Sequence, residues 1–413
     1  MPLELSIALS HLLHRRRQTL ISVLGVALGV GFFIGIASMM QGFQHLFIEK
    51  VIDIQPHVLM KDEYRVPELQ PSIRDYPGGA VSLSGLKPRD EVRGIRGARR
   101  IVAALREMPG VRVAPSMAGQ VLLRYGTKDV SVSISGIEPA LERRVTNLER
   151  DLVAGALDDL YTAGNGIILG VGVAKKAGVE VGDMLSVVSP QGIVLRMKVV
   201  GVFSSGIVTM DNYDTYVLMK KAQILHNRPN VINRIRLRLD DPQQAEAMAR
   251  LLEDRFGYRS ESWKEASRNV LQIFVIQNGI MYSTVGAILI VACFGIFNVI
   301  STVVFEKTRD IAILKSMGFA EGDIRRVFLI EGFIAGVIGS IAGWLLGWGI
   351  VELLASIRFE LEGFLRTEGF VLYRTPLHYL VGALVAIVSA TFAAWLPARR
   401  AARLNPVDIV RGL

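Results

Sequence analysis

The residues best suited to specific chemistry lie at 305–319, in the sequence FEKTRDIAILKSMGF. Five of its side chains are charged: Glu306, Lys307, Arg309, Asp310 and Lys315. Between them Ile311, Leu314 and Met317 predict one apolar ridge on a helix, with charges beside it to fix its register. Gly318 is suited to end that helix. These residue types predict an amphipathic helix rather than a reactive centre, and a helix that only lies on a surface remains an alternative to a binding site.

No catalytic or nucleotide-binding pattern accompanies this segment. The dipeptide Gly-Lys is absent from the sequence, so there is no Walker A loop to hold a nucleotide phosphate. The glycines at 164, 166, 170 and 172 do not complete a G-x-G-x-x-G pattern, because Lys175 replaces the third glycine, and they predict turns. The histidines, at 11, 14, 45, 57, 226 and 378, lack metal-binding spacing. We expect no metal or cofactor on this chain.

The elements that must position the charged segment are apolar helices. Hydrophobic residues make up 51% of the 413 residues and the mean hydropathy is +0.37, values that indicate a membrane protein. Four segments have about the 20 residues that a helix needs to cross a bilayer. They are Thr19–Met40, roughly Val285–Phe305, roughly Val327–Ala355 and Leu377–Leu396. The sequence therefore predicts an α-helical membrane protein with four transmembrane helices and a large α+β periplasmic domain inserted between helices 1 and 2.

The net charge of +9 comes from basic residues that flank these spans. They cluster before the first span (15–17), between the second and third (306–326) and after the fourth (397–413). By the positive-inside rule these regions and both termini are cytoplasmic, whereas 41–269 and the loop 356–376 are periplasmic. This explanation of the charge disfavours a nucleic-acid partner. Glu331 and Glu352 lie near predicted span ends, so they give little support to proton-driven transport.

The first 18 residues predict a cytoplasmic amphipathic helix on the inner membrane surface, with Leu5, Ala8, Leu9, Leu12 and Leu13 on its apolar face. A cleaved signal peptide remains an alternative, although the apolar run is longer than is typical. The single cysteine, Cys293, falls in the second span and cannot form a disulfide within the chain.

Residues 41–269 predict the α+β domain, either as one unit or as two subdomains with borders near 135 and 220. Strands are expected at Val130–Ile137, Leu195–Phe203 and Val231–Leu239, and helices at Glu91–Met108 and Gln243–Phe256. The Pro-rich stretch 61–88 predicts an irregular loop.

Two features of the spans concern packing. The second apolar pattern covers about 36 residues, 270–305, or about 54 Å of helix, so we expect it to project from the membrane as a stalk; a break near Gly279 is the alternative. Small residues at fourfold spacing let helix backbones approach closely, either within one subunit or in a dimer. They are Gly332, Gly336 and Ser340; Gly339, Gly343 and Gly347; Gly25 and Gly29; and Gly31 and Gly35.

Residues 305–331 resemble the cytoplasmic loop of the four-span ABC-transporter permeases, a superfamily that includes the macrolide exporter, the cell-division permease FtsX and the lipoprotein-releasing Lol permeases. In that family this segment is the coupling helix, which docks on the ATPase. The resemblance assigns this role to Glu306, Lys307, Thr308, Asp310, Ile311, Ala312, Leu314, Lys315, Met317 and Gly318.

The resemblance extends over nearly the whole chain. Segments 22–43, 136–141, 166–183 and 297–302 resemble landmarks of the Lol permeases, and 397–411 resembles the superfamily's ending. The Lol branch fits better than the macrolide branch, whose permease carries its ATPase on the same chain. One Lol permease has a long hairpin that recruits a soluble carrier, but here 188–194 predicts a tight turn, which leaves carrier binding open.

The resemblance implies a permease subunit that extracts lipoproteins from the outer leaflet of the inner membrane, together with a second permease, same or homologous. ATP and magnesium would bind to a separate ATPase chain. The alternatives are efflux of an amphiphile and regulation of a periplasmic enzyme. Acyl chains would contact apolar residues at the outer ends of spans 1 and 2: Ile36, Met39, Met40, Phe43, Phe47, Ile273, Phe274, Ile276, Met281 and Tyr282.

Overall fold

The computed structural model describes residues 3–14, 16–64, 94–358, 360–362 and 366–404. These residues form two compact units. Unit 1 comprises residues 1–46, 272–359 and 368–413, and unit 2 comprises residues 47–271 and 360–367. Most of the Pro-rich stretch predicted as a loop, and the chain end beyond 404, lie outside the described residues.

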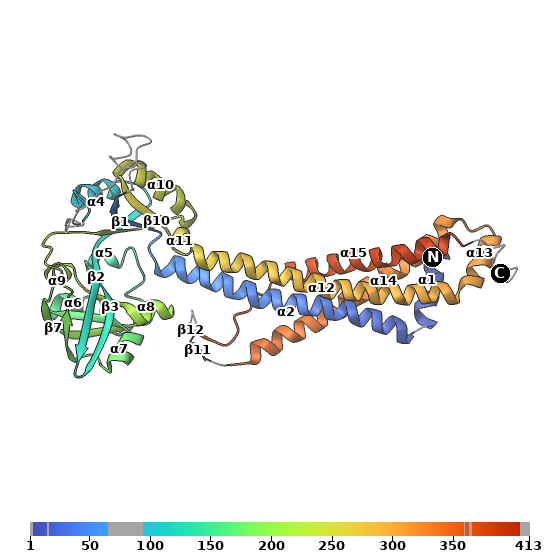
Figure 1. Cartoon of the computed structure of the whole chain (residues 1–413), viewed down its shortest axis with the longest axis horizontal. Coiled ribbons are helices and arrows are strands. Elements are labelled where there is room, and N and C mark those ends of the chain that lie inside the picture. Colours follow the sequence, from blue (N-terminus) through green and yellow to red (C-terminus); the bar gives the residue numbers. More distant parts are fainter. Residues whose placement is uncertain (1–2, 15, 65–93, 359, 363–365, 405–413) are drawn as a thin grey trace, which may run out of the picture. The chain divides into compact units, whose positions relative to one another are not determined.

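Unit 1 is built from long apolar helices, as predicted (Figure 1). Four of them are long and apolar enough to cross a membrane: α2 (Arg16–Ile54), α12 (Arg268–Glu306), α14 (Glu321–Ser356) and α15 (Pro376–Ala402). At 39 residues each, α2 and α12 extend about 58 Å, nearly twice the thickness of a bilayer core. The predicted long second helix is confirmed, without a break at Gly279, and α2 extends 14 residues beyond the predicted first span.

Each row of small residues packs against a different helix of this unit. A Cβ atom added at Gly336 would lie 3.0 Å from Ala390 on α15, and one added at Gly343 would lie 2.6 Å from Val30 on α2. Gly29 faces Leu289 on α12 in the same way, at 3.3 Å. Contact within one subunit, one of the two readings left open above, is therefore confirmed for these positions, because side chains there would push the helices apart.

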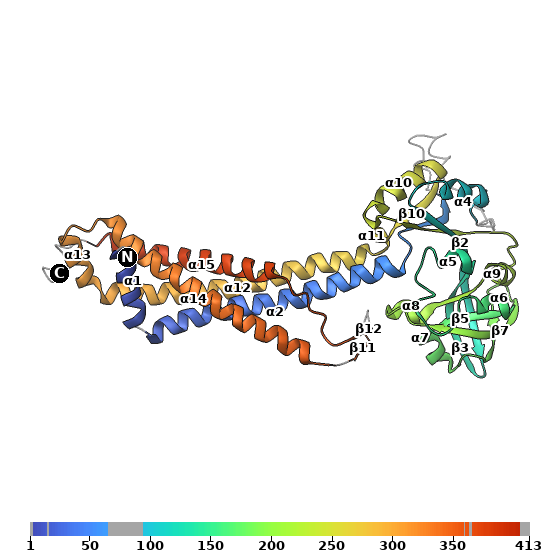
Figure 2. The ribbon, with the colours of Figure 1, turned by 180° about the vertical axis from the view of Figure 1, so that it is seen from behind.

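α2 and α12 run antiparallel and lie side by side (Figures 1 and 2). Gly25 lies against Ala292, and Gln44 donates a hydrogen bond to Asn278 at 3.1 Å. Near that contact His378 of α15 is buried, and its ring lies 2.9 Å from Gln41 Oε1. This polar contact ties α15 to α2.

The predicted amphipathic N-terminal helix is α1 (Leu3–His14), but another helix covers its apolar face. Ala8 and Leu12 are buried, and the His11 ring lies 6.1 Å from that of Phe328 on α14. His11 Nδ1 also lies 3.8 Å from the Glu331 carboxylate, which is 4% exposed. Part of the apolar face of α1 therefore packs on α14, and its position on the membrane surface stays a prediction.

Unit 2 contains a mixed sheet of ten strands in the order β10-β1-β9-β2-β3-β8-β5-β7-β4, with β6 paired to β2 and β7. The strands are β1 (Val58–Tyr64), β2 (Val111–Tyr125), β3 (Lys128–Ile137), β4 (Leu152–Gly155), β5 (Gly166–Gly170), β6 (Met184–Val188), β7 (Val194–Phe203), β8 (Asp214–Leu218), β9 (Arg234–Leu239) and β10 (Tyr258–Ser262). The short helices are α4 (Ala98–Arg106), α5 (Pro139–Glu142), α6 (Asp159–Thr162), α7 (Val171–Ala177), α8 (Val208–Tyr213), α9 (Met219–Leu225), η1 (Pro242–Gln244), α10 (Ala245–Phe256) and α11 (Trp263–Ala266).

The predicted strands and helices are confirmed with small shifts. The helix expected from Glu91 begins at Ala98, after Gly97 at φ +67°, and the strand expected from Val231 begins at Arg234. The stretch expected as an irregular loop from Lys61 begins as strand, because β1 pairs there with β9.

The predicted tight turn at 188–194 is confirmed by the Ser189 N–H to Ile193 carbonyl bond of 2.9 Å. The predicted turn at Gly164 is also confirmed, with φ +63°. Gly170, in contrast, ends a strand, and a Cβ there would lie 2.3 Å from the Asp211 carbonyl oxygen.

The long strand β2 belongs to both halves of the sheet. Its residues 111–116 pair with β9, and its residues 117–125 pair with β3. The partner of β2 therefore changes between Ser116 and Met117, whereas the border expected near 135 falls inside β3. A two-stranded pair, β11 (Glu360–Glu362) and β12 (Arg366–Glu368), completes the described elements.

Candidate functional site

The charged segment folds as the helix α13 (Thr308–Ser316). Thr308 Oγ1 donates to the Val304 and Phe305 carbonyls at 2.9 and 2.7 Å, at the join with α12. Gly318 adopts φ +103° and the Phe319 N–H bonds to the Leu314 carbonyl, so the predicted helix stop at Gly318 is confirmed. Glu306, predicted as part of this segment, belongs to the last turn of α12.

The predicted ridge of Ile311, Leu314 and Met317 is wrong. Ile311 is 3% exposed in the core of unit 1 and Leu314 packs on that core, whereas Met317 is 75% exposed. A helix turns by 100° per residue, so positions 311 and 317 point about 120° apart. The exposed apolar pair is Ile313 and Met317, which differ by about 40° in direction, and Arg309 precedes them on the same face.

Lys315 also faces the protein rather than its surface. Its Nζ donates to the Ala402 and Leu404 carbonyls, both at 2.8 Å, and its side chain is 13% exposed. Carbonyls at a helix C-terminus lack partners within the helix and favour a cation. Lys315 therefore fastens α13 to the end of α15, and we call this contact the Lys315 latch.

The ten residues predicted to contact an ATPase thus separate into two groups. Ile311, Ala312, Leu314 and Lys315 face the chain itself. The other six are at least partly exposed: Glu306, Lys307, Thr308, Asp310, Met317 and Gly318. Lys307 pairs with Asp310 at 2.7 Å. The spacing of four between Arg309, Ile313 and Met317 is the sequence signal that would have found the exposed face.

Burial also divides the predicted acyl-chain contacts. Phe47, Phe274 and Met281 are at most 5% exposed, so packing within the chain already occupies them. Ile36, Met39, Met40 and Phe43 are partly buried. Ile273, Ile276 and Tyr282 are exposed by 55, 63 and 59%. The prediction is therefore wrong for the three buried residues in this conformation.

Tyr282 lines an apolar groove between α2, α12 and α15 with a volume of about 220 Å³. Phe33 and Gly29 come from α2, and Gly382 comes from α15. The lining is almost wholly apolar, so the groove suits a hydrocarbon group rather than a polar ligand.

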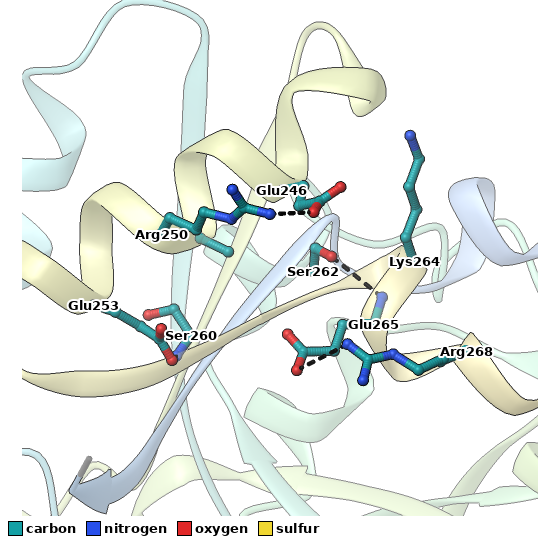
Figure 3. Close-up of a pocket in the computed structure, with 9 residues that line it drawn as sticks. Glu246, Arg250, Glu253, Ser260, Ser262, Lys264, Glu265 and Arg268 are labelled. Carbon is teal, nitrogen blue, oxygen red and sulfur yellow. Dashed lines mark hydrogen bonds and ion pairs between the residues drawn. The ribbon is translucent and has the colours of Figure 1, made fainter. Parts of the chain in front are cut away.

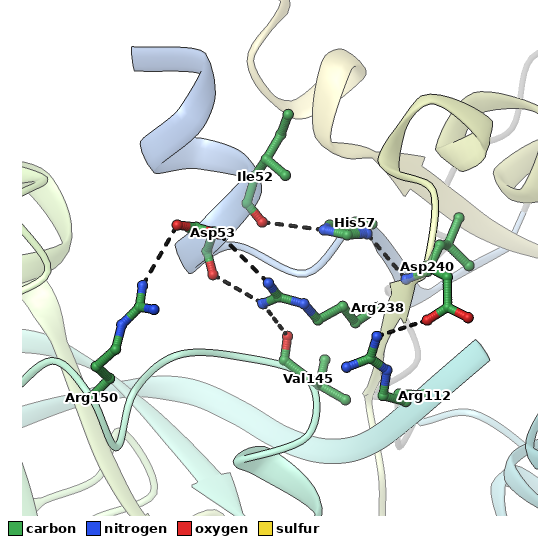
Figure 4. A network of polar contacts seen from close by, with 9 residues as sticks. Ile52, Asp53, His57, Arg112, Val145, Arg150, Arg238 and Asp240 are labelled. Atoms are coloured by element: carbon green, nitrogen blue, oxygen red, sulfur yellow. Dashed lines mark hydrogen bonds and ion pairs between the residues drawn. The ribbon is translucent and has the colours of Figure 1, made fainter. Parts of the chain in front are cut away.

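Unit 2 holds the C-terminal end of α2 through a polar network (Figure 4). His57 Nδ1 accepts from the Leu239 N–H at 3.0 Å, and Nε2 lies 3.2 Å from the Ile52 carbonyl, to which it donates. Arg238 donates to the Asp53 carbonyl at 3.1 Å. Burial, and then Arg238, lower the pKa of His57 below 6.5. The neutral ring is required because a proton on Nδ1 would oppose the Leu239 N–H.

A cavity of about 250 Å³ in unit 2 contains a second cluster of charges. Arg236 is 8% exposed and bonds Glu142 at 2.8 Å. Asp214 lines the same cavity with Arg234, and burial raises the pKa of Asp214 to about 6. A carboxylate that gives up so much solvation destabilises the fold at neutral pH.

A third hollow, of about 410 Å³, lies between α10 and the β10–α11 segment (Figure 3). Its charges pair with each other: Arg250 with Glu246 at 2.7 Å, and Arg268 with Glu265 at 3.6 Å. Among the described residues no group of three or more His, Cys, Asp or Glu side chains could hold a metal ion. We find no nucleophile–base pair in this hollow, and its arrangement is that of a solvated surface.

These features define a protein with membrane-spanning helices and a mixed α/β domain. Residues 19–255 match the MacB-like periplasmic core domain, and residues 282–406 match the FtsX-like permease C-terminal family. The first match covers more than half of the chain, which therefore belongs to the MacB/FtsX family of ABC transporter permeases. Membership of this family and the four apolar helices make it a bacterial inner-membrane protein.

Several proteins resemble the chain over most of its length. The lipoprotein-releasing system transmembrane protein LolC of Neisseria meningitidis is 28% identical over 99% of both chains. LolE of Haemophilus influenzae is 24% identical over 94% of this chain and 93% of its own length. The macrolide export ATP-binding/permease protein MacB of Hyphomonas neptunium is 26% identical over 94% of this chain and 58% of its own. The solved periplasmic region of MacB from Actinobacillus actinomycetemcomitans is 14% identical, covers 52% of this chain and 91% of its own, and has a TM-score of 0.32.

Proposed function

We propose that this chain is the permease subunit of an ABC transporter that extracts lipoproteins from the outer leaflet of the bacterial inner membrane for delivery toward the outer membrane. The observation that carries the proposal is α13, which is fixed to the chain on one face and presents Ile313 and Met317 on the other. The names of relatives that span nearly the whole chain, LolC and LolE, support lipoproteins as the cargo.

The motor is a separate ATPase subunit that docks on the exposed face of α13, and it binds the ATP and magnesium. An exposed apolar pair beside Arg309 and Asp310 offers area for affinity and charge for register. The basic residues near α13 and at the end of α15 support a cytoplasmic position for both termini and α13, by the positive-inside rule. Unit 2 then lies in the periplasm.

A push on α13 moves α12, the helix that precedes it in the sequence, and α12 continues unbroken into unit 2. A second permease, identical or homologous, completes a cavity lined by α2 and α12. Ile273, Ile276 and Tyr282 remain open to the acyl chains of the cargo. A lipid anchor has dozens of CH₂ groups at about 0.8 kcal/mol each, so its withdrawal from the bilayer requires both ATP and a receptive apolar surface.

The docking step is tested by Met317→Arg. A guanidinium at the centre of the exposed apolar pair should abolish co-purification of the ATPase while membrane insertion is unchanged. Ser356→Arg is the matched control, because it adds the same charge at an exposed serine at the other end of α14, away from α13. Full binding of the ATPase by the Met317 variant would show that the contact lies elsewhere.

The cargo is tested by depletion of the protein in its native cell. Outer-membrane lipoproteins should accumulate in the inner membrane, and unaltered sorting would refute lipoprotein release. The relative MacB supports a second candidate, efflux of an amphiphile. Stimulation of ATP hydrolysis by small amphiphiles but not by lipoproteins would favour that function, and ATP-driven control of a periplasmic enzyme without transport would favour regulation. The tight turn at 188–194 leaves no long hairpin for a carrier at that position.

A further inference from the structure

A hollow of about 570 Å³ lies where α14 ends and α15 begins. Trp344, Trp348 and Glu352 line it from α14, at a spacing of four that places them on one face of that helix. Arg374 and Leu380 line the opposite side. We call this hollow the Trp348 groove.

The walls of the Trp348 groove are held in place by the protein itself. Trp344 Nε1 donates to the Tyr379 carbonyl at 2.9 Å, which joins α14 to α15. At the mouth, the two guanidinium nitrogens of Arg374 lie 3.1 and 3.3 Å from the two oxygens of Glu352. The groove therefore exists before any ligand arrives.

The Trp348 groove has an apolar part and a charged rim. Trp348 and Leu380 are 59 and 60% exposed, and the side chains of Arg374 and Glu352 are 60 and 41% exposed. Glu352 lies one turn before α14 ends at Ser356, and Arg374 lies two residues before α15 begins. Tryptophan and tyrosine gather where hydrocarbon meets head groups, and charges next to them contact the head groups.

We propose that the Trp348 groove binds one phospholipid whose head group is zwitterionic and carries a primary ammonium, as in phosphatidylethanolamine. Arg374 donates to the phosphodiester through the donors that Glu352 does not occupy, and Glu352 accepts from the ammonium. One acyl chain lies along Trp348 and Leu380. The proposal concerns lipid rather than cargo, so it does not depend on the function proposed above.

Charge complementarity selects this head group over others. The groove presents a cation and an anion side by side, and the head group presents the opposite pair, separated by two carbons. A choline head group cannot donate a hydrogen bond to Glu352, and a glycerol head group brings no ammonium to that carboxylate. A hydrogen bond to a charged group corresponds to about tenfold or more in affinity, which sets the expected preference.

The experiment uses the full chain in nanodiscs that contain a trace of lipid brominated on its acyl chains. Bromine quenches nearby tryptophan fluorescence, and the quenching lost on Trp348→Phe reports the groove. The quenching lost on Trp395→Phe, at the other end of α15, reports general contact with lipid. Brominated phosphatidylethanolamine, phosphatidylcholine and phosphatidylglycerol are compared.

We expect about tenfold lower apparent affinity for the choline and glycerol lipids than for the ethanolamine lipid at Trp348, and no preference at Trp395. Glu352→Gln should remove the preference over phosphatidylcholine, and Arg374→Gln should weaken binding of all three lipids. Equal quenching by the three lipids at Trp348 would overturn the proposal. A second copy of the chain could instead cover the groove. No lipid would then quench Trp348, and two chains carrying Arg374→Cys would form a disulfide with each other. This result would also overturn the proposal.

Discussion

Replacement of Lys315 by methionine tests whether movement of α13 is transmitted through its contact with the end of α15. The Lys315 latch consists of two bonds of 2.8 Å from Nζ to the carbonyls of Ala402 and Leu404, and the side chain is 13% exposed. Methionine keeps most of the apolar volume but donates nothing. The substitution therefore removes the two hydrogen bonds that join α13 to the end of α15 while it leaves the exposed face of α13 intact.

The expected cost follows from these contacts. A hydrogen bond to a charged group contributes about 1.5–3 kcal/mol, and the freed carbonyls can recover part of this by binding water. We therefore expect a loss of about 2–4 kcal/mol from the attached state of α13. At about 1.4 kcal/mol per factor of ten, the loss lowers the population of attached α13 relative to detached by roughly 30- to 1000-fold. Ile311 and Ala312 stay buried in the variant, so α13 keeps its apolar packing and loses only this polar contact.

The assay is lipoprotein release per ATP hydrolysed by the permease–ATPase complex in nanodiscs. The Lys315→Met complex should bind its ATPase normally and hydrolyse ATP, but it should release at least tenfold less lipoprotein per ATP. Lys307→Met is the matched control: Lys307 pairs with Asp310 on the surface, such a pair contributes less than about 1 kcal/mol, and coupling should be unchanged.

Two results would refute this reasoning. Loss of ATPase binding by the Lys315 variant would mean that this side chain contacts the motor rather than α15. Normal release per ATP, in a variant shown by cross-linking to have α13 detached from α15, would mean that force travels through α12 alone.

Other substitutions test the packing and the charges of the two units. Gly343→Ala should lower the free energy of unfolding of the purified chain by about 1–3 kcal/mol, because the added Cβ would lie 2.6 Å from Val30 on α2. Gly349→Ala, where an added Cβ has no neighbour within 4 Å, should not lower it. The hydrogen bond from the Leu239 N–H to His57 should be complete above pH 6.5 and should be lost as the pH falls below that value toward the lowered pKa of the ring. Faster amide exchange at Leu239 should report the loss, and His57→Gln should remove the pH dependence. Asp214→Asn should raise the free energy of unfolding at pH 7.5 by about 1–3 kcal/mol, because its pKa of about 6 exceeds 3.8, and the gain should disappear below pH 3.8; a destabilised variant at pH 7.5 would contradict this account.

The long helices could be read from the sequence because each one has to satisfy its own backbone and present an apolar surface. This constraint is local, so the existence of the spans and the unbroken α12 were predictable. Their ends were less so, since α2 continues 14 residues past the last residue of the predicted span. The tight turn at 188–194 and the end of the helix at Gly318 likewise depend on residues that are close in the sequence, and both were predicted.

Which face of α13 packs against the bundle could not be predicted from residues close to it in the sequence. Its residues are compatible with either face meeting the bundle, and the choice depends on where the ends of α14 and α15 lie. The same holds for Phe47, Phe274 and Met281, which are as apolar as Ile273 and Ile276 but are buried. A sequence shows that a side chain is apolar, whereas the neighbours that cover it come from other parts of the chain.

The sequence by itself determined a four-span permease with an inserted mixed domain, a charged helix after the second span and no nucleotide-binding loop. Only the tertiary structure decided that Lys315 closes the end of α15, that each row of glycines has its own partner helix, and that α13 leaves the apolar residues Ile313 and Met317 exposed. The physical reason is that helix formation is set by hydrogen bonds over four residues, while burial is set by contacts between segments tens to hundreds of residues apart.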